Sequence, residues 1–486
     1  MKTHSILISI CLISLIGTLC AIPLRLHYTN DTHGAYLPRS YSDERGKQLL
    51  GGYIEAEEVL NKSRSEAIRS IYLDAGDQQT GSAFAGLKYN QAIGGAVIEV
   101  FNMLGVNAAC LGNHEFDISF ANTLRLMEMA KYPFITTNVI YKESRQPLEK
   151  PYHIIKLDSL KIGVLGLTLM ELPDKVKASN VESIEILPYR QAIMEVLDEV
   201  DAQTDLIVIL THNGLEADIE LAKGLDHRVD IIIGGHSHSI LSQPKVVNDI
   251  LILQSGSYLQ YLGALDLDVK EDRIASFSNQ LIPVQVRLKP ASTDLSRFVD
   301  RLRAEIDHSL NRIVGNIPID WVPDKYAETE VSRWQADALV KEYQEIYHVD
   351  LAMINCGGIR KAVAKGPISL KDLSEMLPFN NTITVFSCSG TELMGFYERH
   401  TQKVENRPFD MVQPSAMRYE INAEGQKTLY LYDQIVEPQK TYRVVSHDYL
   451  VGQWQKYLGF APQDVYDTGD LLLDAIVKQV IKQYGK

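Results

Sequence analysis

The chain has 486 residues, of which 45% are hydrophobic and 23% are charged. At about 150 residues per domain this length predicts roughly two to four domains, and the composition excludes a disordered, collagenous or coiled-coil protein. The formal net charge of −14 disfavours a protein that coats nucleic acids or is held on anionic lipid by its charge. An anionic ligand would therefore need a local positive site.

The first 20 residues have the character of a secretory signal peptide. Lys2 precedes an apolar run from Ile6 to Leu19, and Thr18 and Cys20 stand where small residues flank a cleavage site. The alternative is an uncleaved anchor, but the run is short for the roughly 20 apolar residues that span a bilayer. We predict cleavage, export to the periplasm or the cell exterior, and no transmembrane segment in the mature chain. Retention on the cell surface stays open.

Removal of residues 1–20 leaves three cysteines, Cys110, Cys356 and Cys388. They are too few for a disulfide scaffold. Their odd number leaves at least one free thiol or an intermolecular bond, and we predict buried free thiols.

Residues 24–288 alternate short apolar runs with longer amphipathic stretches, which is typical of a layered α/β domain. Several runs are continuous rather than alternating, as expected for strands covered on both faces. Helices are expected between them, for example at 94–104 and 189–202. The predicted strands are Leu24–Tyr28, Ser70–Leu73, Ala108–Leu111, Lys161–Leu167, Leu206–Leu210 and Asp230–Ile233.

A charged amphipathic helix is expected at 294–312, after Pro290. Because it lacks neighbouring strands, it is a candidate interdomain connector. A second α/β mixture follows, with strands expected at 351–354, 382–386 and 442–445. We predict a first domain at 21–289, a linker helix at 290–312 and a second domain at 313–486.

Five strands of the first domain are followed by clusters of metal-ligand residue types. Because the carboxyl ends of strands form one rim in layered α/β folds, these clusters can meet in one crevice. Asp31 and His33 lie two apart, so on an extended backbone they point the same way and can hold one ion; the same applies to His236 and His238. The clusters are Thr29-Asn30-Asp31-Thr32-His33-Gly34, Asp74-Ala75-Gly76-Asp77, Gly112-Asn113-His114-Glu115-Phe116-Asp117, Thr211-His212-Asn213-Gly214 and Gly234-Gly235-His236-Ser237-His238.

Two aspartates, one asparagine and four histidines in these clusters form a candidate ligand set. Such oxygen and nitrogen ligands suit Zn, Mn, Fe or Co rather than calcium. With one carboxylate used twice, they are enough for two four-coordinate divalent ions, which could clamp an in-line displacement at phosphorus. An isolated Asp-x-His or Thr-His pair is usually structural, so the prediction depends on all five clusters.

These motifs resemble those of the calcineurin-like metallophosphoesterases, and the whole mature chain is similar to the two-domain, secreted 5′-nucleotidases of that superfamily. The resemblance implies a four-layer metallophosphoesterase sandwich, joined by a helix to a smaller α/β C-terminal substrate-binding domain. The motifs that carry it are Asp31-x-His33, Gly76-Asp77, Gly112-Asn113-His114-Glu115, His212, Gly235-His236-Ser237-His238, Asn355-Cys356-Gly357-Gly358-Ile359-Arg360 and Leu377-Pro378-Phe379-Asn380-Asn381.

The resemblance also implies a ligand set for each of two metal ions, with Asp77 bridging them. A hydroxide shared by the ions would attack phosphorus. The family position of His238 is often Gln or Asn, so a histidine there could change the metal preference. The implied ligands are Asp31, His33, Asp77 and His238 for one ion, and Asp77, Asn113, His212 and His236 for the other.

By the same resemblance, His114 is catalytic: it faces the phosphoryl group, stabilises developing charge and protonates the leaving alkoxide. Asp117 matches the family's partner carboxylate, which would orient this imidazole and keep it protonated if a helix begins at Glu115. The alternative for Asp117 is a carboxylate that interacts with the helix N-terminus. We expect Glu115 to support the site rather than act in catalysis.

The second domain would bind the rest of a nucleotide. The resemblance implies that the turn at Gly358 brings the Arg360 guanidinium to a phosphate, that Asn355 contacts the base and that Phe379 stacks on it. The alternatives are a surface arginine and a core phenylalanine.

Two segments depart from the family pattern. The usual Gly-Gly-Asp-Gly-aromatic segment is replaced by residues 449–460. Trp454, Tyr457 or Phe460 could supply its aromatic, and we take Tyr457 as the candidate; no aspartate stands in place for the ribose. The usual Gly-Asn of the second domain's first helix is replaced around Arg333, which is either a second phosphate anchor or a surface charge.

The sequence therefore predicts a dinuclear-metal phosphohydrolase that acts on nucleotides, above all 5′-nucleoside monophosphates. No nucleic-acid polymer is expected as a partner. One alternative keeps the metal chemistry but acts on cyclic nucleotide phosphodiesters, nucleotide-sugars or a thiosulfate ester. Another is a non-catalytic protein that binds metal and ligand. The sequence leaves the metal identity and the oligomeric state open.

Overall fold

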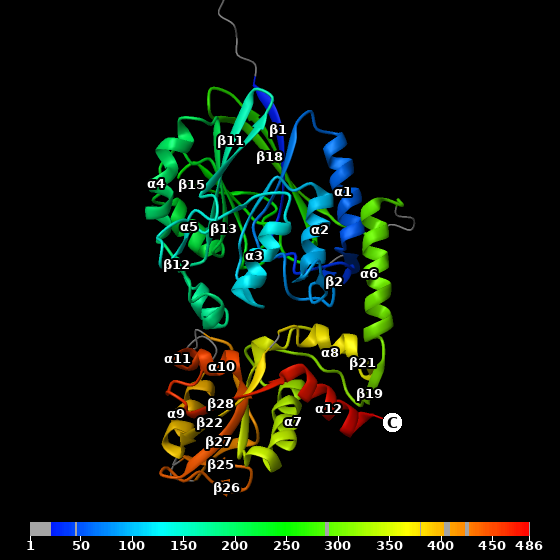
Figure 1. Ribbon diagram of the computed structural model, residues 1–486, viewed down its shortest axis with the longest axis vertical. Helices are drawn as coiled ribbons and strands as arrows, with labels where there is room; N and C mark the ends of the chain where they lie inside the picture. The colour runs from blue at the N-terminus through cyan, green and yellow to red at the C-terminus, as the bar shows by residue number, and fades with distance from the viewer. Residues whose placement is uncertain are drawn as a thin grey trace, which may run out of the picture.

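The computed structural model describes residues 21–43, 46–286, 291–379, 381–402, 409–422 and 427–485. The predicted signal peptide, Pro290 and Asn380 lie outside the described residues. Two lobes are stacked end to end, and helix α6 (Asp294–Leu310) runs along one side from the first towards the second (Figure 1).

The first domain is built around two six-stranded sheets that face each other. Apolar side chains such as Leu26, Leu73 and Val208 fill the space between the sheets. The first sheet has the order β18 (Ile274–Pro283), β17 (Tyr261–Val269), β1 (Ile22–Thr29), β4 (Ser70–Asp74), β7 (Ala108–Cys110) and β8 (Phe134–Ile135). The second has the order β10 (Tyr152–Leu157), β11 (Leu160–Thr168), β13 (Leu206–His212), β14 (Ile231–Gly234), β16 (Ile250–Leu253) and β15 (Lys245–Val247).

Helices cover the outer face of each sheet, which completes the four-layer sandwich and confirms the predicted fold. Residues Val208 and Ile209 show why the strands are continuous apolar runs: one faces the other sheet and the next faces a helix. The helices α1 (Tyr53–Ser65), α2 (Gly95–Leu104) and α3 (Phe120–Met129) pack on the first sheet, and α4 (Tyr189–Asp201) and α5 (Leu215–Ala222) on the second. Three two-stranded ribbons complete the domain: β2 (Arg39–Asp43) with β3 (Gly46–Leu50), β5 (Lys88–Tyr89) with β6 (Ala92–Ile93), and β9 (Val139–Tyr141) with β12 (Ile184–Ile186).

The linker helix α6 packs as part of the first domain. A capping box between Thr293 and Ser296 begins the helix. Its apolar stripe is buried with α1 and α2 rather than against the second domain. Near its end, Asp307 accepts a hydrogen bond from Lys371 of the second domain at 3.0 Å. The stripe comprises Leu295, Phe298, Val299, Leu302 and Ile306.

The second domain has a five-stranded sheet of order β23-β20-β27-β22-β28, with a layer on each face. Its strands are β20 (Leu351–Asn355), β22 (Thr382–Ser389), β23 (Val412–Pro414), β27 (Thr441–His447) and β28 (Gln463–Leu471). One face packs against α7 (Glu330–Tyr347) and α12 (Leu472–Tyr484); the other packs against α9 (Gly390–His400), α10 (Asp448–Gly452), α11 (Trp454–Tyr457) and the small sheet of β24 (Met417–Ile421), β25 (Lys427–Leu431) and β26 (Gln434–Ile435). The ribbon of β19 (Ile313–Ile317) and β21 (Gly366–Ser369) and the helix α8 (Leu370–Met376) lie next to α6 (Figure 1).

The predicted strands and helices are all present, within a few residues of their expected ends. Cys110, Cys356 and Cys388 are buried free thiols, as predicted. Among the described helices, none combines the length and apolar character that a membrane crossing requires.

Candidate metal centre and interdomain cleft

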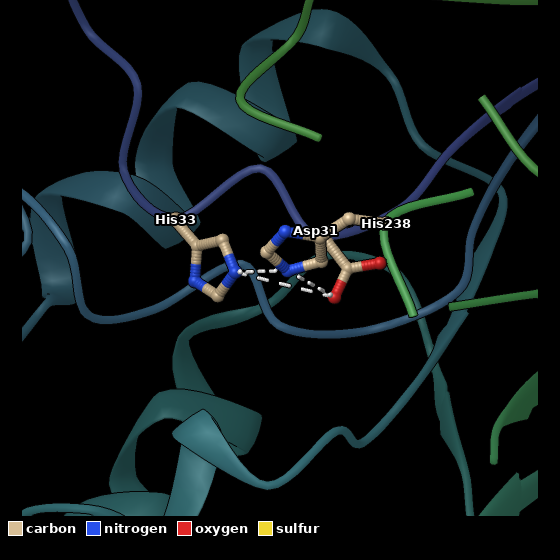
Figure 2. A group of neighbouring side chains, drawn as sticks. All are labelled: Asp31, His33 and His238. Carbon is tan, nitrogen blue, oxygen red and sulfur yellow. Dashed lines mark hydrogen bonds and ion pairs between the residues drawn. The ribbon is translucent and has the colours of Figure 1, made fainter. Parts of the chain in front are cut away.

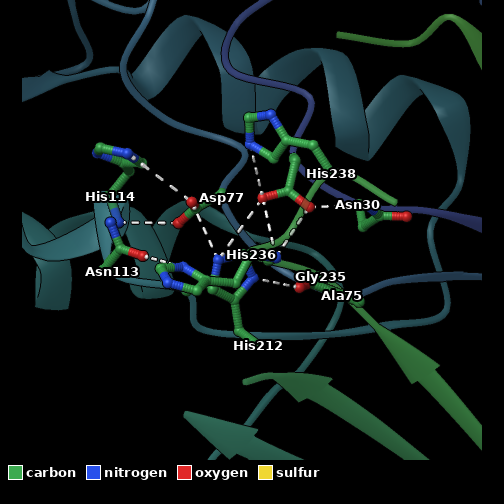
Figure 3. A network of polar contacts seen from close by, with 12 residues as sticks. Asn30, Ala75, Asp77, Asn113, His114, His212, Gly235, His236 and His238 are labelled. Carbon is green, nitrogen blue, oxygen red and sulfur yellow. Dashed lines mark hydrogen bonds and ion pairs between the residues drawn. The ribbon is translucent and has the colours of Figure 1, made fainter. Parts of the chain in front are cut away.

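The five predicted clusters converge at one end of the first domain, but they come from two sheets. Those after β1, β4 and β7 belong to the first sheet, and those after β13 and β14 to the second. Strands of both sheets end at the same rim, so candidate ligands as far apart in the sequence as Asp31 and His238 come together there (Figure 3).

One group of candidate ligands is Asp31, His33 and His238 (Figure 2). Nε2 of His238 lies 3.3 Å from Oδ1 of Asp31 and 3.1 Å from Nε2 of His33. All three side chains are directed at one point.

A second group is Asp77, His212 and His236. Nε2 of His212 lies 3.0 Å from Oδ2 of Asp77, and Nδ1 of His236 lies 3.0 Å from Oδ1 of Asn113 (Figure 3). His212 also approaches Asp31 to 3.7 Å, which connects the two groups. The structure thus brings together all seven residues that the sequence suggested as ligands.

The backbone at these residues differs from the prediction. Asp31 and His33 have φ of 51° and 49°, so they converge through left-handed turns rather than on an extended strand. Asp77, His236 and His238 are also left-handed. The expectation from spacing that His236 and His238 share one ion is wrong, because they join different groups. Strained backbone of this kind collects at functional sites.

The hydrogen bonds of His212 and His33 orient their other ring nitrogens so that these can bind a cation. Nδ1 of His212 lies 2.7 Å from the Ala75 carbonyl oxygen, which only accepts, so this nitrogen carries the proton. In the neutral imidazole with this proton, Nε2 has its lone pair directed towards the Asp77 carboxylate at 3.0 Å. His33 repeats the pattern, with Nδ1 3.1 Å from the Thr80 oxygen and Nε2 facing His238. Lone pairs that face other electron-rich atoms are stabilised by a metal ion between them.

Glu115 holds the loop that carries Asp77. Its buried carboxylate accepts hydrogen bonds from four backbone N–H groups, those of Asp77, Gln78, Gln79 and Gly112, at 2.7 to 3.2 Å. Burial, helped by the charge of Asp77, raises the pKa of Glu115 to about 7. The side chain supports the site, as expected, and does not face the cleft.

His114 and Asp117 form the predicted pair. Nδ1 of His114 lies 2.6 Å from Oδ2 of Asp117, which also accepts a hydrogen bond from Thr80 at 2.7 Å. Burial alone would lower the pKa of His114, but Asp117 and Asp77 raise it to about 9, so the imidazole is protonated at neutral pH. His114 also forms a third cluster with His33 and Asp77.

A cavity of about 510 Å³ lies between this rim and the second domain. The predicted residues Asn355, Gly358, Arg360, Phe379 and Tyr457 all line it. The ring of Phe379 stacks on that of His114 with 5.9 Å between centroids, and the Arg360 guanidinium lies 5.8 Å from the same phenyl ring. Side chains of the second domain therefore reach the candidate centre of the first.

One predicted residue of the second domain lies outside the cleft, and another lines the cleft with little exposed surface. Arg333 does not line the cleft; it is exposed on α7 and pairs with Glu330 at 2.8 Å, so the surface alternative replaces the phosphate anchor. Tyr457 is only 1% exposed. Tyr449, in front of it, is half-buried and lines the cleft, and sequence reasoning passed it over. The sequence feature that could have identified Tyr449 is its position just after strand β27.

A second residue missed from the sequence is Tyr258. Its ring lies 5.0 Å from that of His33 and 6.0 Å from that of His238, and the Arg39 guanidinium covers it at 3.7 Å. Tyr258 has φ of 51°, and nothing in the local sequence indicates this left-handed turn.

Buried His447, which contacts Asn355 of the cleft, should make the free energy of unfolding depend on pH. Buried His447 donates from Nε2 to Oδ1 of Asn355 at 2.8 Å, and burial lowers its pKa from 6.5 to about 4. The folded state therefore takes up this proton less readily than the unfolded state. The resulting stability is complete above pH 6.5 and is lost as the pH falls towards 4, by about 2.5 kcal/mol at pH 4.5.

We expect His447→Gln to remove this part of the pH dependence, because glutamine keeps a donor but cannot be protonated. Urea unfolding at pH 7 and pH 4.5 measures it, and His308→Gln, an exposed site on α6, is the control. Parallel loss of stability in wild type and His447→Gln would contradict this assignment.

Two facing sheets inside helical layers, with paired Asp/His groups at the shared strand ends, define a metallophosphoesterase, a metal-dependent hydrolase of phosphoesters. Sequence profiles agree: the calcineurin-like phosphoesterase family matches residues 24–239, and the 5′-nucleotidase C-terminal domain matches residues 314–461. The chain belongs to the 5′-nucleotidase family of calcineurin-like phosphoesterases.

Similar proteins extend over both domains. An apyrase from Tabanus yao is 26% identical over 88% of this chain and 85% of its own length. A snake venom 5′-nucleotidase from Naja atra is 25% identical over 95% of this chain and 96% of its own. The crystal structure of a 5′-nucleotidase precursor from Thermus thermophilus superimposes with a TM-score of 0.82, covering 95% of this chain and 97% of that chain at 22% identity, and shares the fold.

Proposed function

We propose that the protein hydrolyses 5′-nucleotides, nucleoside monophosphates among them, to the nucleoside-side alcohol and inorganic phosphate. In this reaction, water adds to phosphorus and the bond between phosphorus and the ester oxygen breaks. The observation that carries the proposal is one cavity lined by members of both Asp/His groups on one wall and by second-domain side chains on the other. The first wall includes Asp77, His236 and His238, and the second includes Arg360, Phe379 and Tyr449. Relatives named apyrase and 5′-nucleotidase support it.

The proposed ligand sets are those of the two groups. When bound, two divalent transition-metal ions would supply positive charge for the phosphoryl oxygens and would acidify water. One ion would be held by Asp31, His33, Asp77 and His238, and the other by Asp77, Asn113, His212 and His236.

The other residues have roles that their positions support. Protonated His114, held by Asp117, would donate its Nε2 proton to the leaving oxygen. Arg360 would bind phosphoryl oxygens from the opposite wall. Phe379 would stack on the base and Asn355 would contact it, with Tyr449 and Tyr457 supplying further aromatic surface. The hydrogen bond from His447 to Oδ1 would hold the Asn355 side chain in place.

We further propose that the domains divide at 21–289, 290–312 and 313–486 and that the protein is exported. The match of the two family profiles to separate segments supports the division. The character of residues 1–20 and the venom source of one relative support export.

Hydrolysis of AMP, UDP-glucose and bis(p-nitrophenyl) phosphate, followed through released phosphate, uridine monophosphate and p-nitrophenol respectively and compared before and after chelation, tests the proposal. We expect AMP to have a higher kcat/KM than the diester, chelation to abolish turnover, and Mn or Zn to restore it. AMP hydrolysis that survives complete metal removal, or a diester that is the better substrate, would exclude it.

A further inference from the structure

A sixth strand of the first domain also ends beside the metal groups. Strand β16 runs parallel to its neighbour β14, so the residues that follow the two strands reach the same rim. The residues after β14 form the histidine loop, 235–239, which carries the candidate ligands His236 and His238. The residue after β16 is Gln254, which is fully buried and has no part in the proposed ligand sets.

The Gln254 amide holds both ends of the histidine loop. Its Oε1 accepts hydrogen bonds from the backbone N–H of Ser239 and from the Ser237 hydroxyl, each at 3.0 Å. Its Nε2 donates to the Gly235 carbonyl oxygen at 3.3 Å. One buried side chain therefore fixes the backbone on either side of the two histidines.

A glycine before the histidine loop leaves room for this amide. A Cβ atom at Gly234 would lie only 2.8 Å from Nε2 of Gln254 and would also overlap Oδ2 of Asp218. Only a residue without a side chain lets the end of β14 pack so closely against Gln254. The close contact between the two strand ends is thus part of the local sequence.

The segment after β16 also holds Asp31. Asn30, which is 1% exposed, donates from Nδ2 to Oδ2 of Asp31 and to the Gly256 carbonyl oxygen, both at 2.7 Å (Figure 3). Its Oδ1 accepts from the backbone N–H of Ser255 at 2.8 Å and from the hydroxyl of that residue at 2.9 Å. While Oδ2 of Asp31 is bound to Asn30, Oδ1 faces His238 at 3.3 Å.

Hydrogen bonds to the ligands of a metal help to determine how tightly the ion is bound. A ligand that is already oriented has little freedom to lose when the ion binds, whereas a mobile ligand must be ordered at that moment. Gln254 and Asn30 carry no charge and are buried behind the ligands, so they act on an ion by orienting those ligands. Loss of such contacts typically costs about 10–100-fold in metal affinity.

We propose that Gln254 and Asn30 are positioning residues that set the metal affinity of the centre. Gln254 acts through the histidine loop, which supplies one ligand to each proposed ion. Asn30 acts through Asp31, which belongs to the first proposed ion alone. The inference rests on the ligand sets of the proposed function. Loss of the Gln254 amide should therefore weaken the binding of both ions, and loss of the Asn30 amide the binding of one.

Calorimetric titration of the metal-free protein with Mn²⁺ tests this assignment without any turnover. Gln254→Met has nearly the same shape but cannot form these hydrogen bonds, so it should raise the dissociation constants of both ions by about 10–100-fold. Asn30→Leu should raise one constant by this amount and leave the other within about threefold of wild type. Gln191→Met, at an exposed position of α4, is the matched control and should bind Mn²⁺ as wild type does.

The dependence of AMP hydrolysis on Mn²⁺ separates positioning from general damage to the fold. Because every proposed ligand remains in Gln254→Met, saturating Mn²⁺ should restore kcat to within about threefold of wild type, at a concentration about 10–100-fold higher. A damaged fold would lower kcat at every Mn²⁺ concentration. Ser237→Ala, at an exposed position, removes one of the Gln254 contacts and should weaken Mn²⁺ binding by about fivefold, since one ordinary hydrogen bond is lost.

Unchanged Mn²⁺ affinity in Gln254→Met or in Asn30→Leu would overturn the role of that residue, as would a loss of kcat that saturating Mn²⁺ does not restore. Equal weakening of both ions in Asn30→Leu would overturn its selective action through Asp31. If Gln254→Met does not fold, wild-type affinity in Ser237→Ala overturns the role of Gln254. All these results leave the proposed function intact, whereas a wild-type protein that binds no Mn²⁺ contradicts the proposed ligand sets themselves.

Discussion

Asp77→Asn is expected to lower kcat for phosphate release by about 10³-fold or more, since losing one preorganised electrostatic contact typically costs 10²–10³-fold. The reason is its position. Asp77 is in two of the three Asp/His clusters, and Oδ2 lies 3.0 Å from His212 while Oδ1 accepts from the backbone N–H of His114 at 2.9 Å. Asp77 shares one cluster with His33 of the first proposed ligand set and another with His212 and His236 of the second, so its loss should affect both.

Metal content separates this prediction from simple misfolding. Wild type should bind two divalent ions per chain, and Asp77→Asn should bind fewer, while its circular dichroism stays that of wild type. Asp158→Asn, an exposed carboxylate paired with Arg69, is the control and should keep both ions. Two ions per chain together with wild-type turnover in Asp77→Asn would refute the bridging role.

His114→Gln is expected to lower kcat for AMP by about 10²–10⁴-fold, the range for loss of a general acid. Unlike Asp77→Asn, it should leave metal content unchanged. A good leaving group needs little protonation, so p-nitrophenyl phosphate should suffer much less than AMP. Because Asp117 acts through His114, the double variant with Asp117→Asn should be no slower than His114→Gln alone.

The same measurements decide whether His114 acts as a general acid or as a metal ligand in the third cluster. His114 lies with His33 and Asp77 within reach of one ion, so a metal ligand is the competing role. If His114→Gln loses an ion, or if AMP and p-nitrophenyl phosphate are slowed equally, His114 is a ligand rather than the acid. Gln146→Asn, in an exposed loop, is the control for activity or metal lost during purification.

Much of the fold could be predicted because its signals are local. Continuous apolar runs such as 206–210 reveal strands covered on both faces, and the stripe of α6 reveals a helix with one buried side. The residue types after each strand likewise suggested the ligands. The sequence could not show that the five strands belong to two different sheets, because strand neighbours are set by long-range packing.

The site differs from its prediction where backbone conformation, or contacts with residues distant in sequence, set the position of a side chain. His236 and His238 fall into separate groups because left-handed turns redirect their side chains. Tyr449 lines the cleft beside the nearly buried Tyr457, and Arg333 pairs with Glu330 on the surface. None of these outcomes follows from residue type or spacing.

The side chains available for metal binding and phosphoryl chemistry, and their place directly after strands, could be identified from short stretches of sequence. Such information is local, since strand periodicity and ligand chemistry are properties of short segments. Which ligands share a group, and that side chains of both domains line one cleft, follows from the folded chain. These arrangements depend on how two sheets and two domains pack, which sums contacts between residues hundreds of positions apart.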